Sequence, residues 1–186
     1  MRVVAGEAKG RALVAPPPSV TRAATERIRE SLFAILEPRL GDARVLDLFA
    51  GAGTLGIEAL SRGAAHATFV ERDRAALSAL RRNLAATGFG DRSSVVPRTV
   101  AAYLDGAPAG PFDLVFCDPP FADARGLGAT LRHPGLRAAL APDALVVARA
   151  LRKHPPAVPE GATALRTKEI GEEVLVFLRY DASRPS

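Results

Sequence analysis

The stretch DLFAGAGTLG, residues 47–56, joins an apolar run to a helical pattern through three glycines. The run RVLDLFA (44–50) that leads into it predicts a buried strand, and the pattern after Gly53 predicts a helix from about residue 54. Gly51 and Gly53 let the backbone turn tightly and approach a ligand closely. A strand that passes through such a turn into a helix is the first unit of an α/β fold, with a binding site at the carboxyl edge of the sheet.

The alternation of strand and helix patterns continues downstream of this unit. It indicates a parallel, doubly wound sheet of seven strands. Only Ile170-Gly171-Glu172 separates the last two strand patterns, so the final strand should run antiparallel. The predicted elements are strands 67–71, 93–97, 112–117, 144–148, 163–169 and 173–180, and helices 74–86, 99–104 and about 126–140.

A small basic extension precedes the sheet. Strand patterns at 2–5 and 11–14 predict a hairpin, and helical spacing from the N-cap Thr25 to Pro38 predicts a helix that exposes arginine. Residues 1–40 hold seven basic and four acidic side chains, whereas 41–150 hold twelve and eleven. This local excess indicates an anionic partner. We therefore predict two parts, a basic hairpin and helix over 1–40 and one domain over 41–181.

The composition limits the class of protein. A chain of 186 residues with 48% hydrophobic and 24% charged residues is typical of one soluble α/β domain. The single cysteine, Cys117, excludes a disulfide within the chain, and no apolar run reaches membrane-spanning length, so we expect a cytoplasmic protein. His66, His133 and His154 lie far apart, and no metal site is predicted.

The glycine turn fits two cofactors. Gly51, Gly53 and Gly56 satisfy the pattern G-x-G-x-x-G, which suits either a dinucleotide or S-adenosylmethionine. Glu71 follows Gly51 by twenty positions and ends the second strand, where it would accept hydrogen bonds from ribose hydroxyls. Both cofactors predict that acid, so the turn alone leaves the two open.

A second stretch, FDLVFCDPPF (112–121), separates these two possibilities. Its prolines cannot donate to a sheet, so the strand must end at Asp118. The Asp118 oxygens and the Pro119 carbonyl would form an acceptor cluster suited to an amino group, and Phe121 offers a face on which an unstacked base could lie. These features favour chemistry on an amine.

DPPF resembles the (N/D)-PP-(F/Y) motif of class I S-adenosylmethionine-dependent methyltransferases that act on exocyclic amines. Three further stretches are similar to the bacterial enzymes that methylate a guanine N2 in 16S ribosomal RNA: RVVAGEAKGRAL (2–13), RAATERIRESLF (22–33) and DLFAGAGTLGIEALSRG (47–63). The likeness covers nearly the whole chain. Its most specific parts are the arginine-rich N-terminal segment and DPPF.

The resemblance implies a class I, Rossmann-like methyltransferase fold, S-adenosylmethionine as cofactor, and a monomer that acts on 16S ribosomal RNA within a small-subunit particle or assembly intermediate. The implied cofactor residues are Asp47, Phe49, Gly51, Gly53, Glu71, Arg72, Thr99 and Asp118. The implied catalytic residues that hold the base are Asp118, Pro119, Pro120 and Phe121. The implied RNA-binding residues are Lys9, Arg11, Arg22, Arg27 and Arg29.

The chain departs from the family pattern at a few positions, and other functions stay open. It has Ala23-Ala24 where the family tends to have Pro-Thr, Thr99 where Asp or Asn is frequent, and Ala148-Arg149 where a Glu often follows the strand. The alternatives are methylation of DNA adenine N6 or protein glutamine N5, an NAD(P)-binding oxidoreductase, and a non-catalytic RNA-binding assembly factor.

Overall fold

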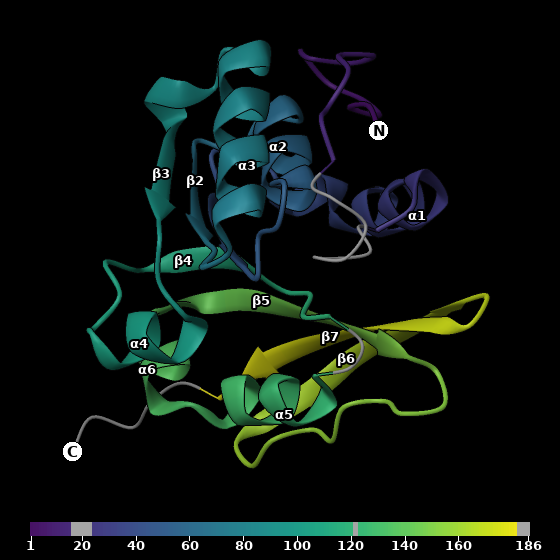
Figure 1. Cartoon of the computed structure of the whole chain (residues 1–186). Helices are drawn as coiled ribbons and strands as arrows, with labels where there is room; N and C mark the ends of the chain where they lie inside the picture. Colours follow the sequence, from purple (N-terminus) through teal and green to yellow (C-terminus); the bar gives the residue numbers. More distant parts are fainter. Residues whose placement is uncertain (16–23, 121–122, 182–186) are drawn as a thin grey trace.

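Seven strands form one sheet through the middle of the molecule, in the order β3-β2-β1-β4-β5-β7-β6 (Figure 1). This structure is a computed structural model that describes residues 1–15, 24–120 and 123–181. The strands are β1 (Arg44–Leu48), β2 (His66–Val70), β3 (Ser93–Val96), β4 (Phe112–Cys117), β5 (Leu140–Leu151), β6 (Ala162–Ile170) and β7 (Glu173–Tyr180). All neighbours from β3 to β5 pair in parallel, and β7 lies antiparallel between β5 and β6. The predicted sheet and its antiparallel last strand are confirmed.

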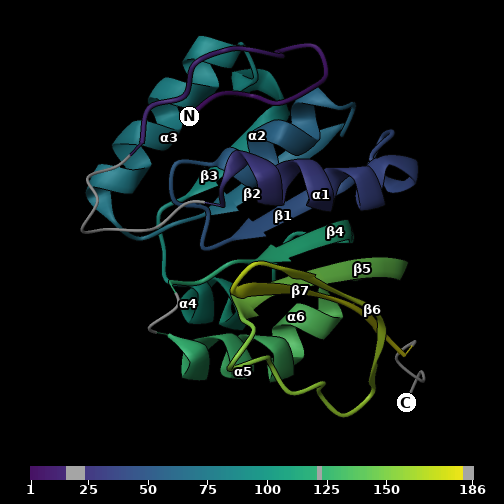
Figure 2. The same cartoon turned by 90° about the vertical axis from the view of Figure 1, so that its right-hand side faces the viewer.

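Helices cover both faces of the sheet (Figure 2). They are α1 (Glu26–Leu36), α2 (Thr54–Ser61), α3 (Arg74–Thr87), α4 (Val100–Asp105), α5 (Ala124–Arg132) and α6 (Pro134–Ala138), with short 3-10 turns η1 (Glu37–Arg39) and η2 (Gly90–Arg92). The first three helices share one apolar cluster with the sheet, and the last three share the other. This is the doubly wound arrangement that the alternating pattern predicted.

The first fifteen residues form a shorter hairpin than the sequence predicted. Its two arms pair antiparallel at an isolated bridge between Arg2 and Ala12, and Val3 N donates to the Arg11 carbonyl at 3.0 Å. Backbone groups beside this bridge bond to side chains of two helices: Val4 N and Ala5 N donate to Glu58 of α2, and Val14 N donates to Asn83 of α3 at 2.7 Å. Long-range side-chain acceptors therefore fasten the short hairpin to the helices.

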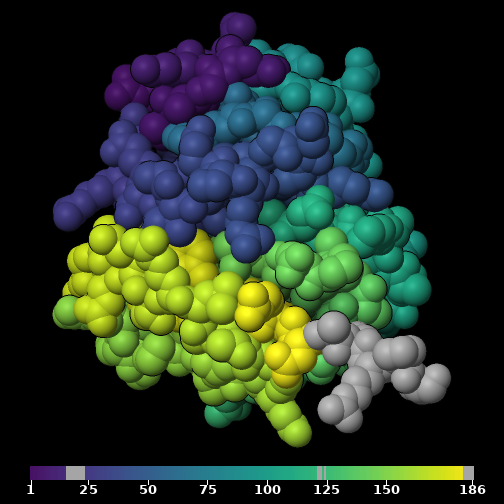
Figure 3. All heavy atoms as spheres, turned by 180° about the vertical axis from the view of Figure 1, so that it is seen from behind, coloured from purple at the N-terminus to yellow at the C-terminus, as the bar shows by residue number. Residues whose placement is uncertain are grey.

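The N-terminal extension and the sheet share one core. Phe33 of α1 packs on Phe116 of β4 with ring centroids 5.8 Å apart, and Val3 and Leu13 belong to the same cluster. Seen from behind, the N-terminal segment, α1 and the β6–β7 strands form adjoining parts of one surface, although they come from opposite ends of the chain (Figure 3). The proposed division of the chain at residues 40 and 41 stays a prediction.

The prediction of a single helix over about 126–140 is wrong. The structure has α5 and α6 in its place, divided at His133, where the backbone is extended (φ −69°, ψ 127°) because Pro134 follows. Pro134 occupies the first turn of α6, the helical position that tolerates a missing N–H. Because α6 ends at Ala138, β5 begins at Leu140, four residues before the predicted strand.

In the part of the chain that the structure describes, we find no helix with the length and apolar character needed to cross a membrane.

Candidate active site

The site begins at the glycine turn between β1 and α2. Phe49, Gly51 and Gly53 all have positive φ, at 67°, 55° and 81°. A methyl group on Gly53 would lie 2.4 Å from Leu80 Cδ1, and one on Gly56 would lie 2.3 Å from Phe69 Cε1. The first glycines therefore permit the turn, and the third lets α2 pack closely on β2.

Two buried carboxylates hold this turn in place. Asp47 accepts from Gly56 N at 3.0 Å, and Glu71 accepts from Gly51 N at 2.8 Å. Glu71 also accepts from the backbone N–H groups of Arg72 and Asp73, each at 2.8 Å. An ionised carboxylate offers about four acceptor positions, so Glu71 keeps about one for a ligand. Burial raises the pKa of Asp47 to about 8, and the negative charges of Asp118 and Glu71 add to that shift.

A cavity of about 730 Å³ lies beside the turn, at the carboxyl edge of the sheet. This volume falls within the range of small-molecule and cofactor pockets. Five of the residues expected at the site line it: Phe49, Glu71, Arg72, Thr99 and Pro120. Asp47, Gly51, Gly53 and Asp118 are not among its lining residues, and Gly51 is joined to the wall by its hydrogen bond to Glu71.

Other parts of the cavity wall carried no signal in the sequence. Arg98 comes just before α4, and Gly126, Ala129 and Thr130 come from α5. Thr99 is also the N-cap of α4, since its hydroxyl accepts from Ala102 N at 3.2 Å. No motif marks the α5 residues, and only the packing of that helix brings them to the cavity.

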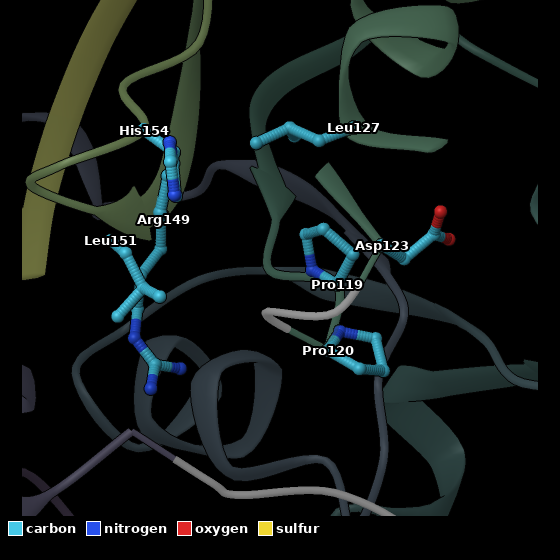
Figure 4. A pocket seen from close by; sticks show the side chains of 8 residues that line it. Pro119, Pro120, Asp123, Leu127, Arg149, Leu151 and His154 are labelled. Atoms are coloured by element: carbon cyan, nitrogen blue, oxygen red, sulfur yellow. The ribbon is translucent and has the colours of Figure 1, made fainter. Parts of the chain in front are cut away.

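The Asp-Pro-Pro turn ends β4 between this cavity and a small cleft. Figure 4 shows Pro119 and Pro120 opposite Arg149 and Leu151, with Leu127 and His154 at one end of the cleft. Pro120 and Asp123 line both the cleft and the larger cavity. Phe121, the fourth residue of the motif, lies outside the described residues.

Asp118 has a partner that the sequence did not reveal. Arg149 Nη1 donates to both Asp118 oxygens, at 2.7 and 2.6 Å, and Arg149 Nε donates to Glu173 at 2.6 Å. Burial raises the pKa of Asp118, whereas the Arg149 charge opposes that shift. The available signal was an arginine inside an apolar strand, at a position where the family pattern often has an acid.

The predicted RNA-binding side chains fall into three groups. Lys9, Arg11 and Arg27 are exposed, as an RNA contact requires, whereas Arg22 lies outside the described residues. The expectation that Arg29 is exposed is wrong, because the N-terminal segment covers that side of α1. Arg29 Nη2 donates to the Arg2 carbonyl at 2.9 Å, and burial lowers its pKa.

No cluster of three or more histidine, cysteine or acidic side chains that could hold a metal occurs among residues 1–15, 24–120 and 123–181.

Comparison with known proteins places the chain in a family. The family model described as Conserved hypothetical protein 95 matches residues 1–179. The chain is 45% identical over 128 residues to Ribosomal RNA small subunit methyltransferase D of Escherichia coli K12, a match that spans 68% of this chain and 62% of that protein. It is 32% identical over 176 residues to the protein of the same name from Haemophilus influenzae, covering 92% of this chain and 89% of that one.

Solved structures agree with this result and with the predicted fold class. The Escherichia coli protein yhhF is 36% identical, with a TM-score of 0.84, and the alignment covers 98% of this chain and 99% of that one. A hypothetical protein from Thermus thermophilus is 32% identical, with a TM-score of 0.79 over 95% of this chain and 98% of the other. The seven-stranded, mostly parallel sheet is the class I methyltransferase fold.

Proposed function

Because the chain belongs to the Conserved hypothetical protein 95 family, we propose that it methylates the exocyclic N2 of a guanine in 16S ribosomal RNA, with S-adenosylmethionine as the methyl donor. The names of its relatives support a small-subunit ribosomal RNA substrate. The match to the Escherichia coli protein spans 62% of that protein's length, so the activity of the whole protein is part of the proposal. The choice of an amine rests on the resemblance of DPPF to amine-methylating enzymes, and the guanine N2 specificity rests on the resemblance of residues 2–13, 22–33 and 47–63, together with DPPF, to the 16S ribosomal RNA enzymes.

One observation carries the proposal: the Asp-Pro-Pro turn separates two hollows that share Pro120 and Asp123. The larger hollow has the volume of a cofactor pocket, whereas the smaller one, bordered by the prolines and Arg149, has a volume of about 20 Å³, room for about one water molecule. A methyl group carried by a ligand in the larger hollow would reach an amine held at this turn. In-line transfer requires that kind of juxtaposition.

The residues of the larger cavity fit S-adenosylmethionine. Glu71 keeps an acceptor position suited to a ribose hydroxyl, and Thr99 and Phe49 lie on the same wall. Asp47, Gly51 and Gly53 would hold the backbone of the turn close to the methionine part, and Arg72 would border the ribose. When bound, the cofactor supplies an electrophilic methyl group on a sulfonium.

Asp118 and the Pro119 carbonyl would orient the amine. The lone pair of guanine N2 is delocalised into the ring, so the rate should depend mainly on alignment. Hydrogen bonds from the amine to these acceptors would aim the nitrogen at the methyl carbon. The N–C bond forms as the C–S bond breaks, and the surplus proton on nitrogen leaves to solvent. Phe121 would stack on the base.

The substrate guanine must be unstacked, because an A-form helix hides a paired base from such a cleft. A structured RNA loop within a small-subunit particle fits this requirement. Lys9, Arg11 and Arg27 would contact phosphates and set the register. A monomer in the cytoplasm, where ribosomal particles assemble, belongs to the same proposal.

The test is transfer of tritiated methyl from S-adenosylmethionine to unmodified small-subunit particles, free 16S RNA and DNA in parallel, followed by nucleoside analysis. We expect label in N2-methylguanosine from particles or RNA, and none from DNA. Asp143→Asn removes an exposed carboxylate outside the site, and this control variant should transfer as much label as wild type. Tight cofactor binding without label on any nucleic acid would overturn the proposal in favour of a protein substrate or a non-catalytic role.

A further inference from the structure

Arg149 lies inside an apolar strand and ends against the Asp-Pro-Pro turn. Its neighbours along β5, Ala148 and Ala150, are buried, and Arg149 itself is 3% exposed. Cys117 pairs with Ala148, so Arg149 comes one position further along and reaches Asp118, the residue after Cys117. The register of the sheet therefore brings this guanidinium to the turn.

Glu173 holds the other side of the same guanidinium. It is the first residue of β7 and pairs with Leu151, two positions from Arg149, so both side chains share one face of the sheet. Arg149 Nε donates to Glu173 at 2.6 Å, and Nη1 donates to both Asp118 oxygens. The side chains of Asp118, Arg149 and Glu173 are only 14%, 4% and 12% exposed.

Stability alone gives a weak reason for this arrangement. Removing charges from water is costly, and well-packed apolar residues can replace a buried ion pair with little loss of stability. The cluster is also unevenly charged, because one cation serves two carboxylates. A functional reason is available at Asp118, which is the acceptor in the proposed reaction.

Resting on that proposed function, we propose that Arg149 is a positioning residue that keeps the Asp118 carboxylate ionised and oriented to accept a hydrogen bond from the substrate amine, with Glu173 fixing the guanidinium. Arg149 uses about two of the four acceptor positions of Asp118, which leaves about two for the amine. A carboxylate paired in this way is a poor base, so the proton of the product leaves to solvent.

The charged groups around Asp118 predict opposite effects for two substitutions. Asp47 faces it from β1, Arg149 from β5 and Glu173 from β7. Burial raises the pKa of Asp118, Arg149 lowers it, and Glu173 raises it. Loss of the Arg149 charge should therefore raise this pKa further, and loss of the Glu173 charge should lower it.

The experiment compares wild type with Arg149→Met, Arg149→Lys and Glu173→Gln. The control is Arg152→Met, because Arg152 forms an exposed ion pair with Glu169 at 3.4 Å, three residues beyond Arg149. Two quantities are measured: the pH dependence of single-turnover methyl transfer to small-subunit particles, and the titration of the Asp118 carboxyl by carbon NMR in the free protein. The Asp118→Asn spectrum assigns the signal.

We expect Arg149→Met to lower turnover on the order of 10- to 100-fold, and to move the Asp118 titration and the acid limb of the rate profile to higher pH. Glu173→Gln should move both to lower pH. Arg149→Lys keeps the charge but lacks the planar fork, so it should restore the titration better than the rate. Arg152→Met should change neither quantity.

An unchanged Asp118 titration in Arg149→Met would overturn the proposal. The opposite shifts expected in Arg149→Met and Glu173→Gln distinguish it from a general loss of packing, which would not move the Asp118 pKa up in one variant and down in the other. If Arg149→Met does not fold, Arg149→Lys and Glu173→Gln decide: an upward or absent shift in Glu173→Gln is contrary to it. Lack of methyl transfer by wild type would overturn the proposed function alone, since the NMR titration still decides the role of Arg149.

Discussion

The two sides of the site hold their carboxylates by different means. Among the residues that the structure describes, Asp47 and Glu71 at the glycine turn accept from four backbone N–H groups and from no side chain. At the Asp-Pro-Pro turn, Asp118 is held by the side chain of Arg149. Backbone donors belong to the fold, so no substitution other than proline removes the N–H group itself. A side-chain cation can be replaced by one substitution, so the environment of Asp118 is easier to change than that of Asp47 and Glu71.

The largest effect on the difference between the two sides of the site is expected from removing Asp118. We expect Asp118→Ala to lower turnover on the order of 100- to 1000-fold, because the proposed amine loses a charged acceptor. Asp118→Asn keeps an amide oxygen and should lose less. Single-turnover methyl transfer measures both, with calorimetric binding of S-adenosylmethionine to show that the cofactor side is intact. Near-normal turnover in Asp118→Ala would remove Asp118 from the mechanism.

The backbone side should be disrupted by Gly53→Ala. Its positive φ and the 2.4 Å approach to Leu80 combine conformational strain with a clash, and we expect a loss of about 3 kcal/mol in the free energy of unfolding. Gly88→Ala is the matched control, because Gly88 has a similar φ of 77° and nothing within 4 Å of the added methyl. It should lose about 1 kcal/mol. Urea unfolding measures both, and equal losses would show that the clash has no cost.

A smaller effect is expected in the pH dependence of the free energy of unfolding, to which Asp47 contributes. With a pKa near 8, folded Asp47 keeps its proton at pH values where the unfolded chain has lost it, so its contribution to the free energy of unfolding falls between about pH 4 and pH 8. Asp47→Asn removes this titration and should be more stable than wild type on the order of 1–2 kcal/mol near pH 8. Urea unfolding from pH 4 to pH 9 tests this, and parallel pH curves for the two proteins would contradict it.

The smallest effect should come from outside both carboxylate sites. Arg27→Ala removes an exposed charge, so RNA binding should weaken and its logarithmic salt slope should become shallower by about one unit. The Asp118 titration should stay unchanged. Filter binding of 16S RNA across salt concentrations measures the slope. An unchanged slope would show that Arg27 makes no phosphate contact.

The sequence predicted the sheet well because its information is local. Strand and helix periods, the glycines at 51 and 53, and the prolines after Asp118 each act within a few residues of where they stand. The break in the helix expected over 126–140 is local as well, because Pro134 disfavours a helical conformation at His133.

The errors come from contacts between distant parts of the chain. The N-terminal hairpin is shorter than predicted, and the sequence did not reveal that Glu58 and Asn83 accept hydrogen bonds from its backbone. Arg29 was expected on the surface because helical spacing shows which residues share a side, not which segment covers that side. The sequence marks Arg149 only as a departure from the family pattern, because its partners Asp118 and Glu173 lie 31 and 24 positions away.

The attachment of the N-terminal segment also bears on the order in which the protein forms during synthesis. Val4 N donates to Glu58, which lies 54 positions later in the chain, and Val14 N donates to Asn83, which lies 69 positions later. Residues 1–15 therefore gain these partners late, because α2 and α3 must be made and packed first. The docking of this segment depends on helices that cover the first strands of the sheet, so it follows their folding.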